Sequence, residues 1–297
     1  MKSLMQIFKR WQTTRQNLGQ VLSMNERNLH YVYPHNHRSD FPVADNKLLT
    51  KEIVEKLNVP IPQTYFAYSY FYELRNLKTD LEQHTDFVIK PASGSGGGGI
   101  VVIAGKQGEK WVSVGGTHYT LQDLRKHISD IIFGVYSFGL QDQAIIESRV
   151  VQHPHIDALS PFGLADVRLI LCRHEPVLAM IRLATKASNG TANLHQGAIG
   201  VGVDIATGNT QHASFNGKAV QTHPDSDVPL INQNIPYWSD VLKTAEKVAR
   251  AVPLKYIGVD IAVSENGPRL LEINARPGIE IQNANRQGMR AILESIG

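Results

Sequence analysis

The chain has 297 residues, of which 42% are hydrophobic and 19% charged, and its net charge is +3. This length supports a large core in one or two domains, while the small net charge gives no reason to expect nucleic-acid binding. The single cysteine, Cys172, excludes an internal disulfide and a cysteine-based metal site. We find no signal-peptide pattern and no run typical of a membrane helix, so we expect a cytoplasmic protein.

The first part of the chain is predicted to hold two helices separated by a loop. Residues 4–22 show an amphipathic helical pattern. We expect this helix to pack on the domain or on a second copy of the chain, and its basic side makes a membrane surface the alternative. Residues 31–42 are predicted to form an irregular loop. Asp45 then caps a helix over residues 46–57.

A glycine-rich run lies between two predicted strands, residues 87–91 and 100–103. It contains the spacing G-x-G-x-x-G at Gly94, Gly96 and Gly99. A dinucleotide-binding loop would open a helix and a P-loop would end in Gly-Lys-Ser/Thr, so a following strand excludes both. The run can instead form a lid whose backbone N–H groups bind phosphates. On these residues alone, a flexible surface hairpin is an equal alternative.

The remaining elements favour an α+β fold with mainly antiparallel sheets. Thr120 begins a helix that extends to about residue 133. The later predictions are strands at 143–151, a hairpin at 167–172 and 177–184, a strand at 199–205, and a helix at 238–251. Polar residues around the hairpin and the loop after it could stabilise a transferred phosphoryl group, although each is commonly a solvated surface group: Asp166, Arg168, Arg182, Lys186, Asn193 and His195.

Near its end the chain carries three oxygen-bearing side chains, Asp260, Glu272 and Asn274, in two apolar runs. Residues two apart in a strand face the same side, so Glu272 and Asn274 project together. A two-residue turn at 266–267 would put Asp260 on the opposite face. A three-residue loop at 265–267, with a left-handed glycine last, pairs Asp260 with Glu272. We predict this loop, and with it a site for a divalent cation.

The same register pairs Val259 with Ile273 and Ile261 with Leu271 on the apolar face of the hairpin. One face is then apolar and the other rich in carboxylates, which is the arrangement that a half-buried sheet requires.

Five motifs of this chain occur in the same order as in proteins of the ATP-grasp fold, which the chain therefore resembles. They are Lys47 in "ADNK", then "FVIKPASGSGGGGI", "ADVRLIL", "NLHQGA" and "GVDI…LLEINARPG". The most similar branch is that of the RimK-related α-L-glutamate ligases, which are carboxylate–amine ligases. The resemblance covers about residues 44–285, and its specific part is the terminal pattern.

The resemblance implies two α+β subdomains that clasp ATP, with Mg²⁺ (Mn²⁺ is the alternative) bridging the phosphates. A substrate carboxylate attacks the γ-phosphate to give an acyl phosphate, and an amine then displaces phosphate to form an amide. The implied phosphate-binding and lid residues are Lys47, Lys90, Gly94, Ser95, Gly96, Gly97 and Gly98. The implied adenine, sugar and further nucleotide contacts are Glu147, Ser148, Asp166 and Asn193. The implied metal ligands and charge-stabilising catalytic residues are Asp260, Glu272, Asn274, Arg168, Arg182 and Arg276.

Before Lys47 the sequence departs from the family, whose members usually carry a Rossmann-like domain there. We therefore expect that domain to be missing or much reduced. The expected division is an N-terminal helical arm (1–43), a lysine and glycine-lid subdomain (44–146) and a metal-binding subdomain (147–297). The expected partners are carboxylate and amine substrates, including a peptide or protein end, and a second copy bound through the N-terminal helix. A small-molecule kinase and a non-catalytic nucleotide-binding protein are the alternative functions.

Overall fold

The computed structural model describes residues 19–94 and 96–297, so the predicted helix over residues 4–22 falls almost entirely outside them, as does Ser95. The chain divides into two compact units. We call Pro42–Val151 the lysine unit, and the residues up to Phe41 together with Gln152–Gly297 the carboxylate unit. Among the residues described, no helix has the length and apolar character needed to cross a membrane.

The lysine unit is built on a six-stranded antiparallel sheet with the strand order β1-β6-β2-β3-β4-β5. Its strands are β1 (Thr64–Tyr68), β2 (Phe87–Pro91), β3 (Val101–Gln107), β4 (Lys110–Ser113), β5 (His118–Tyr119) and β6 (Ala144–Glu147). Its helices are α4 (Pro42–Asp45), α5 (Lys47–Glu55), α6 (Leu77–Glu82), which a 3₁₀ turn (Phe71–Asn76) precedes, and α7 (Leu121–Ile132). The helix cap at 46–57 was placed one residue too early, because Asn46 accepts the hydrogen bonds from the first turn of α5.

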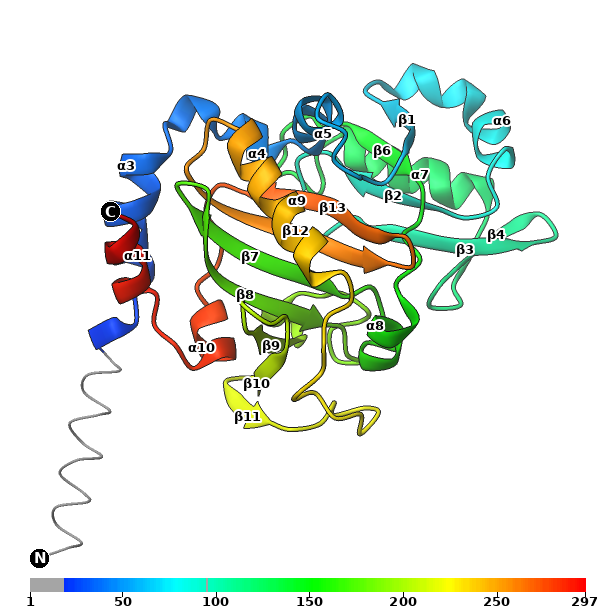
Figure 1. Cartoon of the computed structure of the whole chain (residues 1–297). Helices are drawn as coiled ribbons and strands as arrows, with labels where there is room; N and C mark the ends of the chain where they lie inside the picture. Colours follow the sequence, from blue (N-terminus) through cyan, green and yellow to red (C-terminus); the bar gives the residue numbers. More distant parts are fainter. Residues whose placement is uncertain (1–18, 95) are drawn as a thin grey trace, which may run out of the picture. The chain divides into compact units, whose positions relative to one another are not determined.

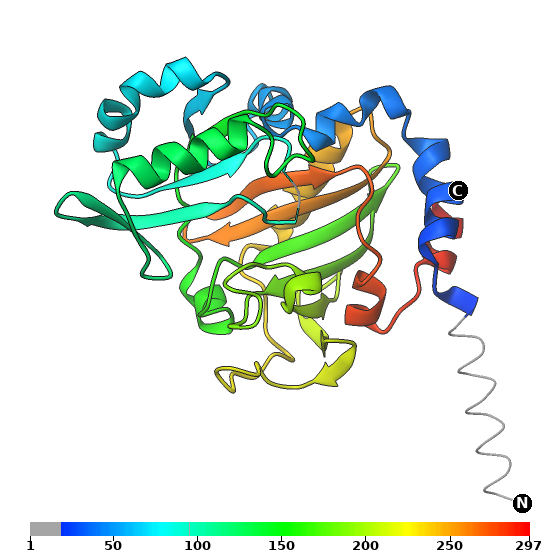
Figure 2. The same cartoon turned by 180° about the vertical axis from the view of Figure 1, so that it is seen from behind.

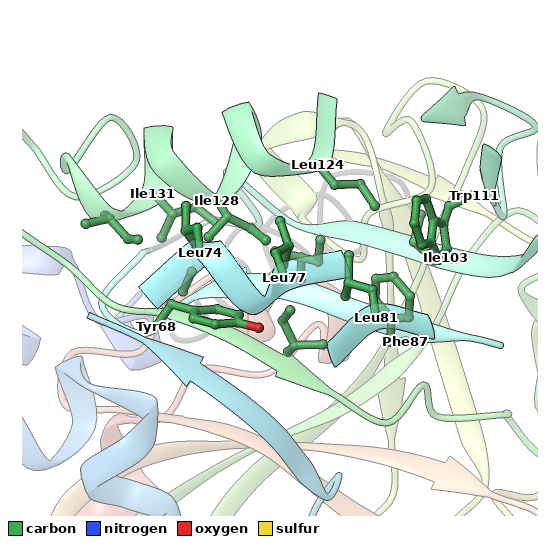
Figure 3. Close-up of a cluster of buried hydrophobic side chains, with 14 residues drawn as sticks. Tyr68, Leu74, Leu77, Leu81, Phe87, Ile103, Trp111, Leu124, Ile128 and Ile131 are labelled. Carbon is green, nitrogen blue, oxygen red and sulfur yellow. The ribbon is translucent and has the colours of Figure 1, made fainter. Parts of the chain in front are cut away.

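Helix α7 closes the core of the lysine unit (Figure 3). Thr120, which was predicted to begin this helix, is its N-cap residue and forms a capping box with Asp123. Leu124, Ile128 and Ile131 recur at helical spacing and are fully buried. In Figure 3 these side chains face those of α6 and of the 3₁₀ turn before it, with Phe87 and Trp111 of the sheet beside them. This packing fixes the segments that lead into and out of the glycine loop.

The carboxylate unit is built on a seven-stranded antiparallel sheet with the order β11-β10-β9-β8-β7-β12-β13. Its strands are β7 (Asp166–Cys172), β8 (Glu175–Leu183), β9 (Ile199–Val203), β10 (Thr210–Phe215), β11 (Lys218–Val220), β12 (Tyr256–Ser264) and β13 (Gly267–Asn274). Helix α9 (Trp238–Ala251) lies across one face of β12 and β13 (Figure 1). Both sheets agree with the predicted α+β class, and Cys172 is a buried strand thiol.

The opposite face of the carboxylate sheet carries the predicted site residues Arg168 and Asp260. Helix α10 (Ile281–Asn285) covers part of this face, as Figure 2 shows. Glycine makes this close approach possible, since a Cβ on Gly202 of β9 would lie 2.6 Å from the carbonyl oxygen of Ala284. The unit also contains the short helices α8 (Pro154–Leu159) and α11 (Arg290–Ile296).

The loop predicted over residues 31–42 is wrong, because most of this segment is helical. Ser23 and Glu26 form a capping box that starts α2 (Met24–Arg27), and the helical turns continue through a π-helical stretch (Asn28–Val32) into α3 (Tyr33–His35). A 3₁₀ turn (Arg38–Asp40) follows. Pro34 lies within this helical run, just after the π-helical stretch, where proline cannot donate a backbone hydrogen bond to the preceding turn.

Candidate active site

The terminal hairpin brings the predicted metal ligands to one face. Asp260 of β12 lies opposite Glu272 of β13, and Val259 lies opposite Ile273, so this part of the predicted register is confirmed. Val259 and Ile273 are buried on the apolar face. Glu272 and Asp260 therefore share the polar face, and Asn274 joins them two residues further along β13.

The route to this register differs from the predicted one. The turn has two residues instead of three, because Ser264 pairs with Gly267, and the Ser264 hydroxyl closes it by donating to the Gly267 carbonyl at 2.7 Å. Ile261 pairs with Leu270 and not with Leu271. The register then shifts between Asp260 and Ile261, so Leu271 is the extra residue of a β-bulge. The bulge, and not the turn, therefore contains the odd residue that the predicted register requires.

Two arginines, one from β7 and one from β8, bind the carboxylate of Asp260. Arg168 of β7 lies opposite Asp260 in the sheet; its Nε donates to Oδ1 at 2.6 Å and its Nη2 donates to Oδ2. Arg182 of β8 donates from Nη2 to Oδ2 at 2.7 Å. Arg182 also forms a two-bond pair with Asp166, with distances of 2.6 and 2.8 Å. The three strands thus carry one continuous row of alternating charges.

Burial and charge shift the pKa values of this row in opposite directions. Asp260 is 1% exposed. Burial alone would raise its pKa, but the charges of Arg168 and Arg182 outweigh burial and hold it well below its usual range. For Asp166, burial is the largest effect, and with the nearby negative charge of Asp260 it raises the pKa of that carboxyl despite Arg182. At neutral pH the arginines therefore keep Asp260 ionised.

The donor set on this face suits a hard cation in its chemistry. Asp260 and Glu272 offer carboxylate oxygens and Asn274 an amide oxygen, the ligands that Mg²⁺ prefers. Asp260 Oδ1 accepts one bond from Arg168, and a carboxylate oxygen can accept a second partner. No cluster of three His, Cys, Asp or Glu side chains that could hold a metal occurs within residues 19–94 and 96–297. The candidate set contains two such residues and an amide.

Arg276 lies in the turn after β13 and is exposed, with its guanidinium 5.3 Å from the centre of the Phe41 ring. The N-terminal segment also holds this turn. Asn36 Nδ2 donates to the carbonyl before Arg276 at 3.1 Å, and Arg27 Nη1 donates to the carbonyl after it. No local sequence pattern indicates these contacts, because they join residues more than 200 positions apart.

Asn193 begins a 3₁₀ turn (Leu194–Gln196), where its side-chain oxygen accepts a hydrogen bond from the His195 N–H at 3.0 Å. The side chain thus has a local structural use. Its contact with a nucleotide stays a prediction.

In the lysine unit a buried carboxylate is shared by two lysines. Lys90 Nζ lies 2.5 Å from Glu147 Oε1, and Lys51 Nζ lies 2.5 Å from Glu147 Oε2. Lys51 also donates to the Pro62 carbonyl and to Thr64 Oγ1, each at 2.8 Å. Burial lowers the pKa of Lys51. Lys51 is not among the predicted site residues, although its place one helical turn after Lys47 is a signal that could have found it.

The ends of the glycine loop are held by side chains of the lysine unit. Lys47 Nζ donates to the Gly94 carbonyl at 2.8 Å, and Asp142 accepts from the Ser93 N–H. At the other end His127 Nε2 lies 2.9 Å from the Gly99 carbonyl oxygen. Gly96 and Gly97 both have positive φ, which favours glycine. The loop is thus tied at both ends by residues that motif reasoning missed, Asp142 and His127.

Ser148 follows β6 and pairs with Gln63, donating its N–H to the Gln63 carbonyl at 2.8 Å and accepting the Gln63 N–H on its hydroxyl at 2.9 Å. Both groups thus hold two strand ends together. The predicted adenine contact at Glu147 and Ser148 stays a prediction.

Comparisons with known proteins give relatives at low sequence identity. The probable α-L-glutamate ligases of Thioalkalivibrio sulfidiphilus and Ectopseudomonas mendocina are 24% and 22% identical over 249 residues, 84% of this chain and 61% of each relative. The chain thus spans about three-fifths of the length of these curated relatives. Among solved structures, the ATP-grasp ligase PsnB with a minimal precursor gives a TM-score of 0.45 at 12% identity, covering 88% of this chain and 62% of that one.

D-alanyl-alanine synthetase A from Vibrio cholerae gives a TM-score of 0.49 at 12% identity, with 86% and 60% of the two chains covered. A family model described as sugar-transfer associated ATP-grasp matches residues 26–297, almost the whole of the part that the structure describes. The chain belongs to this ATP-grasp family.

Proposed function

We propose that the chain is an ATP- and Mg²⁺-dependent ligase that activates a carboxylate as an acyl phosphate and joins it to an amine. The observation that carries the proposal is the buried charge row of the carboxylate unit. Arg168 and Arg182 bind Asp260, Arg182 also binds Asp166, and Glu272 lies opposite Asp260 on the same face of the sheet. Carboxylate and amide oxygens gathered on one face are the ligands that Mg²⁺ prefers. A divalent cation would be held by Asp260, Glu272 and Asn274.

The arginines of the row suit the handling of charge on a phosphoryl group. Two hydrogen bonds fix Arg182 on Asp166, and two fix Arg168 on Asp260. A guanidinium held in this way loses little further freedom when it meets an anion, which favours stabilisation of a transferred phosphoryl group. Arg276, on the exposed turn, would add a third positive charge. The metal, when bound, would neutralise the phosphates and promote in-line transfer.

We assign the nucleotide to the residues of the lysine unit, with Asp166 and Asn193 as further contacts. Lys51, Lys90 and Glu147 together carry one excess positive charge, which attracts phosphate. Lys47 and the backbone of residues 94–98 would hold the phosphates, since glycines leave the N–H groups accessible. Glu147 and Ser148 would lie at the adenine, Glu147 through its backbone because its carboxylate is bound to two lysines.

A phosphate-release screen tests the proposal. The protein is incubated with ATP and Mg²⁺ and with pools of carboxylates and amines, including glutamate, other amino acids and short peptides. We expect ADP and phosphate release that requires one carboxylate and one amine together. Glu272→Gln keeps the shape of the side chain and removes one carboxylate charge, so we expect it to abolish turnover while leaving the apo melting temperature unchanged or raised.

Two results would decide for another function. ADP release with a single alcohol acceptor and a stable phosphorylated product would make the protein a kinase. ATP binding without turnover in any pool, unaltered by Glu272→Gln, would make it a non-catalytic nucleotide-binding protein.

A further inference from the structure

An uncharged aromatic surface lies on the lysine unit, and the proposed function does not account for it. Two segments form it, residues 69–72 and residues 133–141. Their side chains Tyr70, Phe71, Tyr72, Phe133, Phe138 and Leu140 are each more than half exposed, and Phe138 is 92% exposed. We call these six residues the aromatic patch.

The two segments are joined to each other. The rings of Phe71 and Phe133 stack with their centres 6.5 Å apart. Gln143, just beyond the second segment, donates from Nε2 to the Ser69 hydroxyl at 2.6 Å. The patch is therefore one surface made from two distant parts of the sequence.

The second segment has a defined fold that holds its apolar side chains outward. Gly134 has positive φ, and a Cβ there would lie 2.2 Å from the carbonyl oxygen of Leu140, so the chain folds back on itself at this point. The N–H groups of Ser137 and Gly139 both donate to the Gly134 carbonyl. A loop with such internal bonds pays little further ordering cost when it is covered.

The charges around the patch argue against an anionic partner. Neither segment contains a charged residue. The charged residues that flank them are acidic, Glu73 and Asp142, and both accept hydrogen bonds from neighbouring backbone N–H groups. An anionic lipid surface or a nucleic acid would thus meet no basic side chain in these segments. In a two-fold symmetric contact a charged side chain can face its own copy and be repelled by it. These two segments contain no charged side chain, so this repulsion does not arise within them.

The exposed area is of the size that a dimer needs. Aromatic side chains contribute on the order of 200 Å² each when fully accessible, so the exposed fractions of the patch correspond to roughly 800 Å². Monomeric proteins rarely expose apolar patches larger than about 300–600 Å², and a standard interface buries about 800 Å² per partner. We infer that a second copy of this chain covers the aromatic patch in a two-fold symmetric contact.

Sedimentation of the purified full-length chain over a wide concentration series tests this inference. We expect wild type to form a dimer and Phe138→Asp to raise its dissociation constant by about 100-fold, since each dimer loses the contact twice. Phe138 is almost fully exposed, so the melting temperature of the variant should match that of wild type at concentrations low enough for wild type to be monomeric as well.

A matched pair of tyrosines controls for the loss of any exposed ring. Tyr72 of the patch and Tyr33 of the carboxylate unit are 64% and 58% exposed. We expect Tyr72→Ser to weaken the dimer and Tyr33→Ser to leave it intact. A wild-type monomer throughout the series would overturn the inference, and so would a dimer that survives both Phe138→Asp and Tyr72→Ser. Co-sedimentation of a monomeric wild type with phosphatidylserine vesicles would identify a membrane as the occupant instead.

Discussion

Removal of Arg168 tests whether the buried charge row holds the carboxylate unit together. Arg168→Met keeps a long, flexible side chain but deletes the guanidinium that binds both oxygens of Asp260. Asp260 is 1% exposed and would keep the single bond from Arg182. Leaving a buried charge without its partner lowers the free energy of unfolding by about 3–5 kcal/mol. Because Asp260 keeps one bond to Arg182, we expect a loss at the lower end of this range, about 3 kcal/mol. The melting temperature should fall by about 6–12 °C.

The assay is urea unfolding of the apo protein, followed by circular dichroism and checked by calorimetry. Arg149→Met is the matched control, because Arg149 pairs with Asp86 at 3.1 Å with both side chains at least 30% exposed, and such pairs contribute about 0–1 kcal/mol. The double variant Arg168→Met/Asp260→Asn should lose less than the sum of its single variants by about 1–3 kcal/mol. Equal losses for Arg168→Met and Arg149→Met, or strict additivity in the double variant, would refute the reasoning.

Three further predictions concern the lysine unit. Glu147→Gln should lower the free energy of unfolding by about 3–5 kcal/mol, since it leaves two buried ammonium groups without a counter-charge. Glu52→Gln, which removes a carboxylate from an exposed pair, should lower it by about 0–1 kcal/mol, and urea unfolding compares the two variants. Gly99→Ala should destabilise more than Gly116→Ala by about 1–3 kcal/mol, because both positions have positive φ but only at Gly99 would the new Cβ meet an aromatic ring, at 2.7 Å. Burial lowers the pKa of His127 below 6.5, so its contribution to stability is complete above that pH and is lost as the pH falls through the folded-state value. Melting curves at several pH values should therefore show less acid destabilisation in His127→Gln than in wild type.

The sequence indicated the polar face of the terminal hairpin because strand periodicity is local. Glu272 and Asn274 face the same side in any regular strand, and Asp260 follows once the register is known. The location of the odd residue could not be predicted in the same way. A three-residue turn and a bulge at Leu271 place Asp260 opposite the same residue, and their difference depends on how Ser264 closes the turn.

Other features depend on contacts between distant residues, which no local pattern shows. Asn36 donates to the Tyr256 and Ala275 carbonyls and accepts the N–H groups of Lys255 and Tyr256, so it binds the backbone at the start of β12. Its neighbours in sequence, rich in Tyr, His and Pro, read as a loop. The capping box at Ser23 and this distant backbone partner make the segment helical instead.

The bulge at Leu271 also bears on how the hairpin tolerates insertions and deletions. If Glu265 were deleted, Asn266-Gly267 would become a favoured two-residue turn and the bulge would no longer be needed, yet Asp260 would still lie opposite Glu272. The hairpin can thus absorb a change in length at its tip without moving the carboxylates further along the strands. Family members that lack one residue in this turn should therefore still carry the two carboxylates, with the counterpart of Asp260 opposite the counterpart of Glu272.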